Sequence, residues 1–258
     1  MPLKGKHLLE TQNLTREDIS SILDMAESFK EISTRQIKKV PALRGRTIIN
    51  LFFEPSTRTR TSFEIAGKRL SADVINISGS TSSTVKGENL IDTVRNLEAM
   101  KPDILVVRHS CSGASHLLRQ FVNCPIINAG DGTHEHPTQA LLDLLTIREH
   151  KNNLEGLKAA IIGDIAHSRV ARSNIHAMKV MGLEVTVVGP PTMMPVEIDR
   201  MGVRVEHDLE KAIEDVDVIM ILRIQLERQE NFLIPSLREY SNLYCLTYSK
   251  LMKNNRNP

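Results

Sequence analysis

Hydroxyl and guanidinium side chains follow a short apolar run near the start of the chain. Ser56-Thr57-Arg58-Thr59-Arg60 comes directly after Leu51-Phe52-Phe53-Glu54-Pro55. Unpaired amides at a helix N-terminus, side-chain hydroxyls and an arginine fork are the groups with which proteins bind phosphate. If a helix begins here, these residues predict a site for a small dianion. The alternative is an ordinary capped helix with a solvated arginine.

The local sequence favours a strand, a turn and a helix around this segment. Residues 47–53 are rich in β-branched and apolar side chains, and Pro55 disfavours helical backbone at Glu54. Ser56 or Thr57 can cap a helix over 57–70. The apolar face expected to pack on the sheet comprises Phe63, Ala66, Gly67 and Leu70.

Strand and helix patterns alternate along the rest of the chain. A helix capped by Thr15 comes first, and further strands are expected at 73–77, 104–108, 125–129, 158–162, 184–188, 204–206 and 217–222. Helices are expected between them, and we expect a frayed tail at 251–258. This alternation predicts an α/β protein with two doubly wound parallel-sheet domains, 1–150 and 151–258, and an active site in the cleft between them.

Composition excludes several classes of protein. The 258 residues are 41% hydrophobic and 25% charged, with a net charge of +2, so we expect neither a nucleic-acid nor a membrane partner. Cys111, Cys124 and Cys245 are widely spaced, which suits a reducing cytoplasm better than a disulfide framework. His134 and His136 share one loop without a third ligand at the usual spacing. We therefore expect no metal and no cofactor.

Two further cations could serve the anion site. Arg108 directly follows the apolar run 104–107, so we expect it in the same crevice as the hydroxyls; an interdomain salt bridge is the alternative. Lys86 lies with Ser82 in a loop of small polar residues. It could be a mobile cation that closes over an anion, although most loop lysines are simply solvated.

The loop 131–139 leads into a helix and carries an imidazole and a carboxamide. His136 precedes the first turn and Gln139 lies within it, so both can point to one small carbonyl-bearing ligand. We expect His134 to face solvent.

Two arginines follow strands of the predicted second domain. Gly163-Asp164-Ile165-Ala166-His167-Ser168-Arg169 lacks the second glycine of a dinucleotide fingerprint, which argues against a nicotinamide cofactor. Arg169 and Arg223 instead suit a ligand with two carboxylates. Exposed ion pairs that contribute little are the alternative.

The combined segments resemble the aspartate/ornithine carbamoyltransferase family, and its aspartate branch in particular. They are Ser56 to Arg60, Lys86-Gly87-Glu88, Arg108-His109, His136 to Gln139, Gly163-Asp164 with Arg169, and Arg223-Ile224-Gln225-Leu226-Glu227-Arg228. The resemblance implies Rossmann-like domains and a carbamoyl phosphate site formed by Ser56, Thr57, Arg58, Thr59, Arg108, His136 and Gln139. It implies an aspartate site formed by Arg169, Arg223 and Gln225, together with Lys86.

The resemblance also implies a reaction and an assembly. Arg58, Thr59, Lys86, Arg108 and His136 would be catalytic in transfer of a carbamoyl group to the amine of L-aspartate, a step of pyrimidine synthesis. Ser82 and Lys86 would come from a neighbouring chain of a homotrimer with shared sites, to which regulatory chains bind in some members.

Two alternatives stay open at this point. The ornithine branch is one, although two cationic anchors would repel ornithine's amine. The other follows from the end of the chain, where the family's His-Pro-x-Pro loop and terminal helix do not occur. That pattern leads us to expect a truncated second domain, and a catalytically impaired paralogue that still binds carbamoyl phosphate is the alternative.

Overall fold

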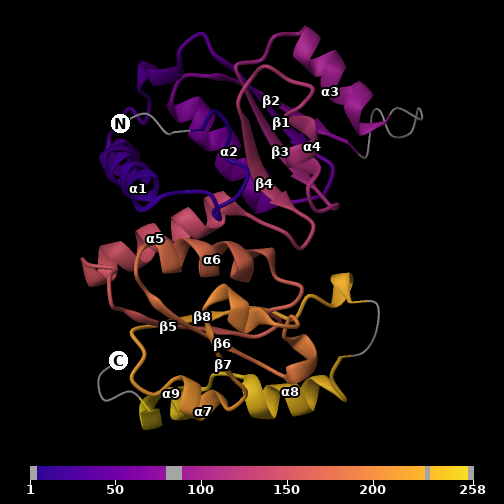
Figure 1. Cartoon of the computed structure of the whole chain (residues 1–258). Helices are drawn as coiled ribbons and strands as arrows, with labels where there is room; N and C mark the ends of the chain where they lie inside the picture. Colours follow the sequence, from indigo (N-terminus) through magenta and orange to yellow (C-terminus); the bar gives the residue numbers. More distant parts are fainter. Residues whose placement is uncertain (1–4, 80–88, 230–232, 255–258) are drawn as a thin grey trace. The chain divides into compact units, whose positions relative to one another are not determined.

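The computed structural model describes residues 5–79, 89–229 and 233–254 (Figure 1). The chain divides into two compact units, Met1–Leu141 and Leu142–Pro258, and each contains one four-stranded parallel sheet. The predicted fold class, two doubly wound parallel sheets, is confirmed. The units divide within helix α5 (Pro137–Lys151). A domain boundary near residue 150 remains our proposal, because α5 ends there before a polar segment.

In the first unit the strand order is β2-β1-β3-β4. The strands are β1 (Thr47–Phe52), β2 (Asp73–Ser78), β3 (Ile104–His109) and β4 (Ile126–Asp131). The helices are α1 (Arg16–Lys30), α2 (Thr57–Arg69), α3 (Leu90–Ala99) and α4 (Ala114–Leu118). Leu51 of β1 packs with Val94 of α3 and Leu118 of α4, whereas Phe52 belongs to a second cluster that includes Phe63 of α2. Successive strand residues therefore contact helices on opposite faces of the sheet.

Helix α2 approaches the sheet at a glycine. A Cβ on Gly67 would lie 2.5 Å from Val74 Cγ2, so only glycine allows this separation. Phe63 is half-buried on the same side, but Ala66 is exposed. The expectation that Ala66 packs on the sheet is wrong, because its direction on the helix is about 100° away from that of Gly67.

The N-terminal segment lies against β4. Leu8 N donates to Ile126 O at 2.9 Å, and Asn128 N donates to Leu8 O at 2.8 Å, so the segment continues the parallel pairing of the sheet. Helix α1 then begins with the expected cap: Thr15 and Asp18 exchange hydrogen bonds in a capping box. This pairing places Glu10 near the carboxyl end of β4.

In the second unit the strand order is β7-β6-β5-β8. The strands are β5 (Lys158–Ile162), β6 (Glu184–Val188), β7 (Arg204–Glu206) and β8 (Val218–Ile221). The helices after α5 are α6 (Arg169–Val180), α7 (Leu209–Ala212), α8 (Leu237–Tyr244) and α9 (Tyr248–Asn254). Ile162 and Val188 form a core cluster with Leu209 of α7, and α6 also contacts β6.

The predicted frayed tail is wrong for its described part. Residues up to Asn254 form α9, and Lys253 Nζ lies 2.6 Å from Glu210 Oε2. Upstream, Tyr244 at the end of α8 donates to His207 O at 3.1 Å. These contacts join sequence-distant segments, which a local pattern does not reveal.

Across the part of the chain that the structure describes, none of the helices has the length and apolar character needed to span a bilayer.

Candidate active site

The predicted anion site is built on the first turn of α2. Ser56 is the N-cap with extended backbone, and its hydroxyl accepts from Thr59 N at 3.3 Å. Thr57 and Arg58 are exposed, and Thr59 is half-buried. The helix begins at Thr57 as expected, so the amides of its first turn, the hydroxyls and the Arg58 guanidinium form one donor-rich surface.

Arg108 ends β3 next to this turn. Phe53 N donates to Arg108 O at 2.9 Å, which keeps the ends of β1 and β3 together. The Arg108 side chain is largely buried, and its guanidinium contacts Glu54 Oε1 at 2.5 Å and Ala129 O at 3.1 Å. The partner of this ion pair lies in the same unit, so an interdomain salt bridge is not needed to explain Arg108. Glu54 fixes the orientation of a charge that a ligand would share.

His136 follows β4, the strand beside β3. The ring is buried, and Thr138 Oγ1 lies 3.3 Å from His136 Nδ1. A hydroxyl that donates to Nδ1 would place the imidazole proton on Nε2. The Nε2–H group could then donate a hydrogen bond to a carbonyl oxygen. Gln139 is half-buried in the first turn of α5, and its backbone N–H donates to His136 O at 3.0 Å. The predicted donors thus follow three strands that are adjacent in one sheet, β1, β3 and β4.

A buried carboxylate shapes the loop that carries His136. Asp131 Oδ1 accepts from Asn128 Nδ2 at 2.8 Å and Glu135 N at 3.1 Å, while Oδ2 accepts from Gly113 N at 2.7 Å. Burial favours the neutral form of Asp131, but hydrogen bonds from His134, Asn128 and Gly113 outweigh it and hold the pKa below its usual range. Asp131 therefore carries a negative charge at neutral pH.

Glu135 supports the same loop from its other side. Its side chain is fully buried, and Oε2 accepts from Thr11 N at 2.9 Å and Thr11 Oγ1 at 2.8 Å. Sequence reasoning missed Glu54, Asp131 and Glu135 as supporting residues. The available signal was their place at or within four residues of a strand's carboxyl end, where acidic side chains accompany the expected cations.

His134 does not face solvent as expected. It is half-buried, its Nδ1 lies 3.2 Å from Asp131 Oδ2, and its ring contacts the ring of His116 with centroids 5.6 Å apart. One possible ligand atom each of His116, Asp131 and His134 lies within 4.8 Å of the others. The sequence spacing predicts no third metal ligand, but the fold brings His116 to His134.

In the second unit a buried aspartate joins the ends of two strands. Asp164 Oδ2 accepts from Gln225 N at 3.1 Å and Gln229 Nε2 at 2.9 Å, and Oδ1 lies 2.7 Å from His167 Nδ1. Gly163 precedes it with φ +132°, and a Cβ there would lie 2.6 Å from Leu222 O. The glycine lets the end of β8 approach β5, and Asp164 then holds the following loop.

Three of the four predicted aspartate ligands, Arg169, Arg223 and Gln225, belong to the second unit and have different environments. Arg169 is the first residue of α6 and is only 3% exposed. Arg223 has a side chain that is 64% exposed and forms an ion pair with Glu227, and this contact holds the pKa of Glu227 at about 2. Gln225 is half-buried, with its backbone fixed by Asp164. The fold therefore orders the backbone near Gln225 but leaves the Arg223 guanidinium at the surface.

Two predicted site residues, Ser82 and Lys86, lie outside the described residues. Their roles remain predictions from the sequence.

The chain belongs to the aspartate/ornithine carbamoyltransferase family. Residues 6–149 match the family's carbamoyl-P binding domain, and residues 155–257 match its Asp/Orn binding domain. The order of these domains agrees with the two sets of candidate ligands.

Relatives narrow the family to its aspartate branch. The chain is 61% identical to the aspartate carbamoyltransferase catalytic subunit of Syntrophotalea carbinolica, over 97% of this chain and 80% of the relative. It is 62% identical to the same subunit of Syntrophus aciditrophicus, over 98% of this chain and 82% of the relative.

Solved structures agree with this placement. Aspartate transcarbamoylase from Trypanosoma cruzi in complex with carbamoyl phosphate has a TM-score of 0.87 and 31% identity, over 98% of this chain and 83% of that chain. The catalytic subunit of M. jannaschii aspartate transcarbamoylase has a TM-score of 0.80 and 37% identity, over 93% of this chain and 79% of that chain.

Proposed function

We propose that this chain transfers the carbamoyl group of carbamoyl phosphate to the amine of L-aspartate, giving N-carbamoyl-L-aspartate and phosphate for pyrimidine biosynthesis. The observation that carries the proposal is the placement of Ser56 to Thr59, Arg108 and His136 at the carboxyl ends of three strands that are adjacent in one sheet. The relatives with 61–62% identity, which are aspartate carbamoyltransferase catalytic subunits, supply the substrate class.

We assign carbamoyl phosphate to the first unit. The first-turn amides of α2, the hydroxyls of Ser56, Thr57 and Thr59, and the Arg58 guanidinium suit a phosphate dianion. Arg108 would contact both the phosphate and the carbonyl oxygen, since its planar fork can donate to two acceptors. Gln139 and His136 would hold the carbamoyl group.

The chemical step needs no covalent intermediate with the enzyme. The aspartate amine attacks the carbamoyl carbon, the carbonyl oxygen gains negative charge, and the C–O bond to phosphate then breaks. Thr59, Arg108 and His136 would stabilise that oxyanion, while Arg58 and Lys86 would neutralise the departing phosphate. The phosphate oxygens can accept the proton that the amine loses.

We assign L-aspartate to the second unit. Arg169, Arg223 and Gln225 suit two carboxylates, and arginine retains its charge at every working pH. The Arg223 ion pair with Glu227 would have to open so that a substrate carboxylate can replace the Glu227 carboxylate. We further propose a homotrimer in which Ser82 and Lys86 reach a neighbouring chain's site, with regulatory chains as a possible addition. A cytoplasmic location is proposed from the wide spacing of the cysteines.

Phosphate release tests the activity directly. The full chain should release phosphate from carbamoyl phosphate with aspartate and not with ornithine, and N-carbamoyl-L-aspartate should form in equal amount. Turnover with ornithine but not with aspartate would overturn the assignment of aspartate as the substrate. Saturable binding of carbamoyl phosphate without turnover would instead identify an impaired paralogue.

A further inference from the structure

Two histidines and two carboxylates from separate segments meet at the carboxyl end of β4. Glu10 comes from the N-terminal segment paired with β4, and His116 comes from α4. Asp131 ends β4, and His134 lies in the loop that follows. Glu10 and His116 are distant in sequence from Asp131 and His134, and none of the four is assigned to substrate in the proposed carbamoyl transfer.

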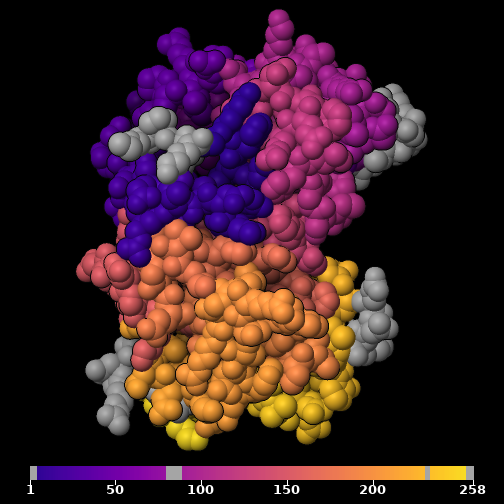
Figure 2. Space-filling view, in the orientation of Figure 1, coloured from indigo at the N-terminus to yellow at the C-terminus, as the bar shows by residue number. Residues whose placement is uncertain are grey.

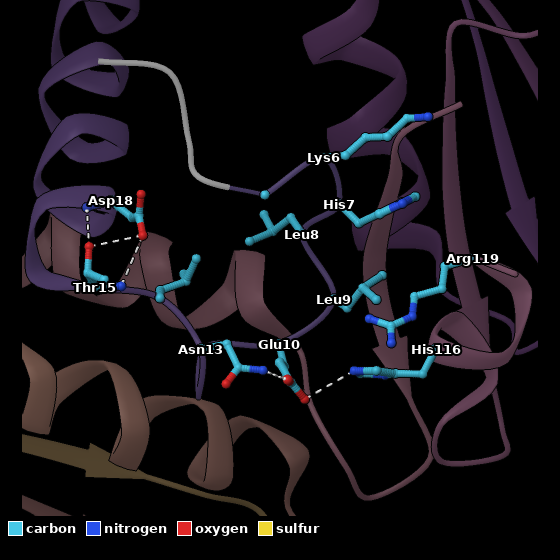
Figure 3. Close-up of a pocket in the computed structure, with 12 residues that line it drawn as sticks. Lys6, His7, Leu8, Leu9, Glu10, Asn13, Thr15, Asp18, His116 and Arg119 are labelled. Atoms are coloured by element: carbon cyan, nitrogen blue, oxygen red, sulfur yellow. Dashed lines mark hydrogen bonds and ion pairs between the residues drawn. The ribbon is translucent and has the colours of Figure 1, made fainter. Parts of the chain in front are cut away.

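One oxygen of the Glu10 carboxylate lies close to Nε2 of both histidines, as it would if these groups shared one ion. Glu10 Oε2 lies 3.2 Å from His116 Nε2 and 3.9 Å from His134 Nε2. Ligand atoms around a tetrahedral zinc ion lie about 3.3 Å apart, since each metal–ligand bond is about 2.0 Å long. Figure 3 shows the Glu10 carboxylate and the His116 ring facing each other.

Asp131 orients one of these histidines. Its Oδ2 lies 3.2 Å from Nδ1 of His134, the ring nitrogen opposite the one nearest Glu10. Asp131 is fully buried and already accepts three other hydrogen bonds, so it suits a fixed supporting role better than direct coordination. A histidine that binds a metal through one nitrogen commonly donates to a carboxylate through the other.

We infer that Glu10, His116 and His134 bind one divalent cation of the zinc class, with Asp131 holding the His134 ring in position. Two imidazoles and one carboxylate favour zinc, cobalt or nickel over magnesium and calcium, which prefer oxygen ligands. A fourth position remains for water.

The surroundings allow an ion to enter. Glu10 and His116 line a surface pocket of about 240 Å³, which Lys6 and Arg119 also line (Figure 3). Both of these cations are exposed, and Lys6 donates to Asn123 O. Their repulsion of an entering ion is therefore weakened by solvent, while Glu10 and Asp131 provide negative charge close to the ion.

A bound ion would connect three segments of the first unit. It would join the N-terminal segment and α4 to the loop that carries His136. Because an ion that binds only the folded state stabilises it by mass action, unfolding of the protein should shift to higher temperature as zinc is added. The role is structural, so the expected readout is binding and stability.

Cobalt titration of the metal-free full chain tests the inference. We expect saturable binding of one Co²⁺ per chain, with intense visible absorption typical of four-coordinate cobalt, and competition by Zn²⁺. His116→Gln and His134→Gln should each weaken binding by at least about 100-fold, whereas Asp131→Asn should weaken it about 10- to 100-fold. The control is His150→Gln, the same change at an exposed histidine of α5, which should bind like the unchanged protein.

Several results would overturn the site. Binding that is unchanged in both histidine variants would exclude their role, and so would the absence of saturable binding in the unchanged protein. A thiolate-to-cobalt charge-transfer band would assign the ion to cysteine instead. Circular dichroism should confirm that each variant is folded. If a histidine variant does not fold, Glu10→Gln tests the same site at a half-buried position on a different segment.

Discussion

Arg108 and Arg223 each follow a parallel strand, but the fold treats them differently. Arg108 has a side chain only 10% exposed and is held by Glu54 and Ala129, whereas Arg223 is 64% exposed and pairs with Glu227 one turn away. The first guanidinium is fixed before a ligand arrives, and the second is free to exchange one carboxylate for another. We therefore expect Arg108 to be preorganised for its ligand and Arg223 to be adaptable.

Each unit also contains one buried aspartate near the carboxyl ends of its strands. Asp131 fixes the loop before His136, and Asp164 fixes the loop around Gln225. The contrast between Arg108 and Arg223 thus lies in the contacts of their own side chains, since a buried aspartate supports a neighbouring loop in both units.

Removal of Arg58 should produce the largest effect. We expect Arg58→Ala to lower kcat/KM by about 100- to 1,000-fold, because a donor to the departing phosphate is lost. Its guanidinium is exposed, so the thermal unfolding temperature should barely change. Steady-state kinetics and circular dichroism measure the two effects.

Arg44→Ala is the matched control for Arg58, since Arg44 is also an exposed arginine near β1 but lies before the strand. It should keep normal kinetics. Equal activity of Arg58→Ala and Arg44→Ala would remove Arg58 from the site.

The two strand-end arginines should differ in stability. Arg108→Ala leaves the Glu54 carboxylate half-buried without its guanidinium, so we expect a loss of about 3 kcal/mol in the free energy of unfolding. Arg223→Ala removes an exposed ion pair and should cost less than about 1 kcal/mol. Urea denaturation followed by circular dichroism provides both values, and similar losses would refute the proposed contrast.

Asp164→Asn should weaken aspartate binding without disturbing carbamoyl phosphate. An amide cannot accept from His167, Gln225 and Gln229 as a carboxylate does, so the loop loses hydrogen bonds. We expect KM for aspartate to rise about tenfold while KM for carbamoyl phosphate stays constant.

Asp217→Asn provides the matched control for Asp164. Asp217 accepts from Lys158 N at the opposite end of β5, so the same chemical change there should leave both KM values unaltered. A rise in both KM values for Asp164→Asn would indicate general damage to the fold.

The smallest expected effect is a pH dependence of stability in the first unit. Burial lowers the pKa of His109 below its ordinary value of 6.5, although Glu54 and Asp131 partly oppose this. Below pH 6.5 the unfolded chain takes up the proton first, so stability should fall as the pH decreases toward the lowered folded-state pKa. Urea denaturation above and below pH 6.5 measures how steeply the free energy of unfolding changes with pH, and His109→Gln should reduce this slope. His150→Gln should leave the slope unchanged. If His109→Gln also leaves it unchanged, the pH dependence of stability comes from other groups.

The sequence alone determined the order of strands and helices and the kinds of ligand each loop could hold. The cap at Ser56, the helix start at Thr57 and the strand that ends near Arg108 depend on neighbours within a few residues. Local hydrogen bonding and the alternation of apolar side chains determine such features, so they can be inferred from residues that are neighbours in the sequence.

Only the tertiary structure decided which charged groups meet. Glu54 contacts Arg108, Glu10 contacts His116, and Asp164 contacts Gln225 across long sequence separations. Their approach depends on the strand order and on how closely the loops pack, which no local pattern encodes. For that reason the sequence predicted the candidate substrate ligands, whereas the buried carboxylates that hold them and the histidine cluster became visible only in the folded chain.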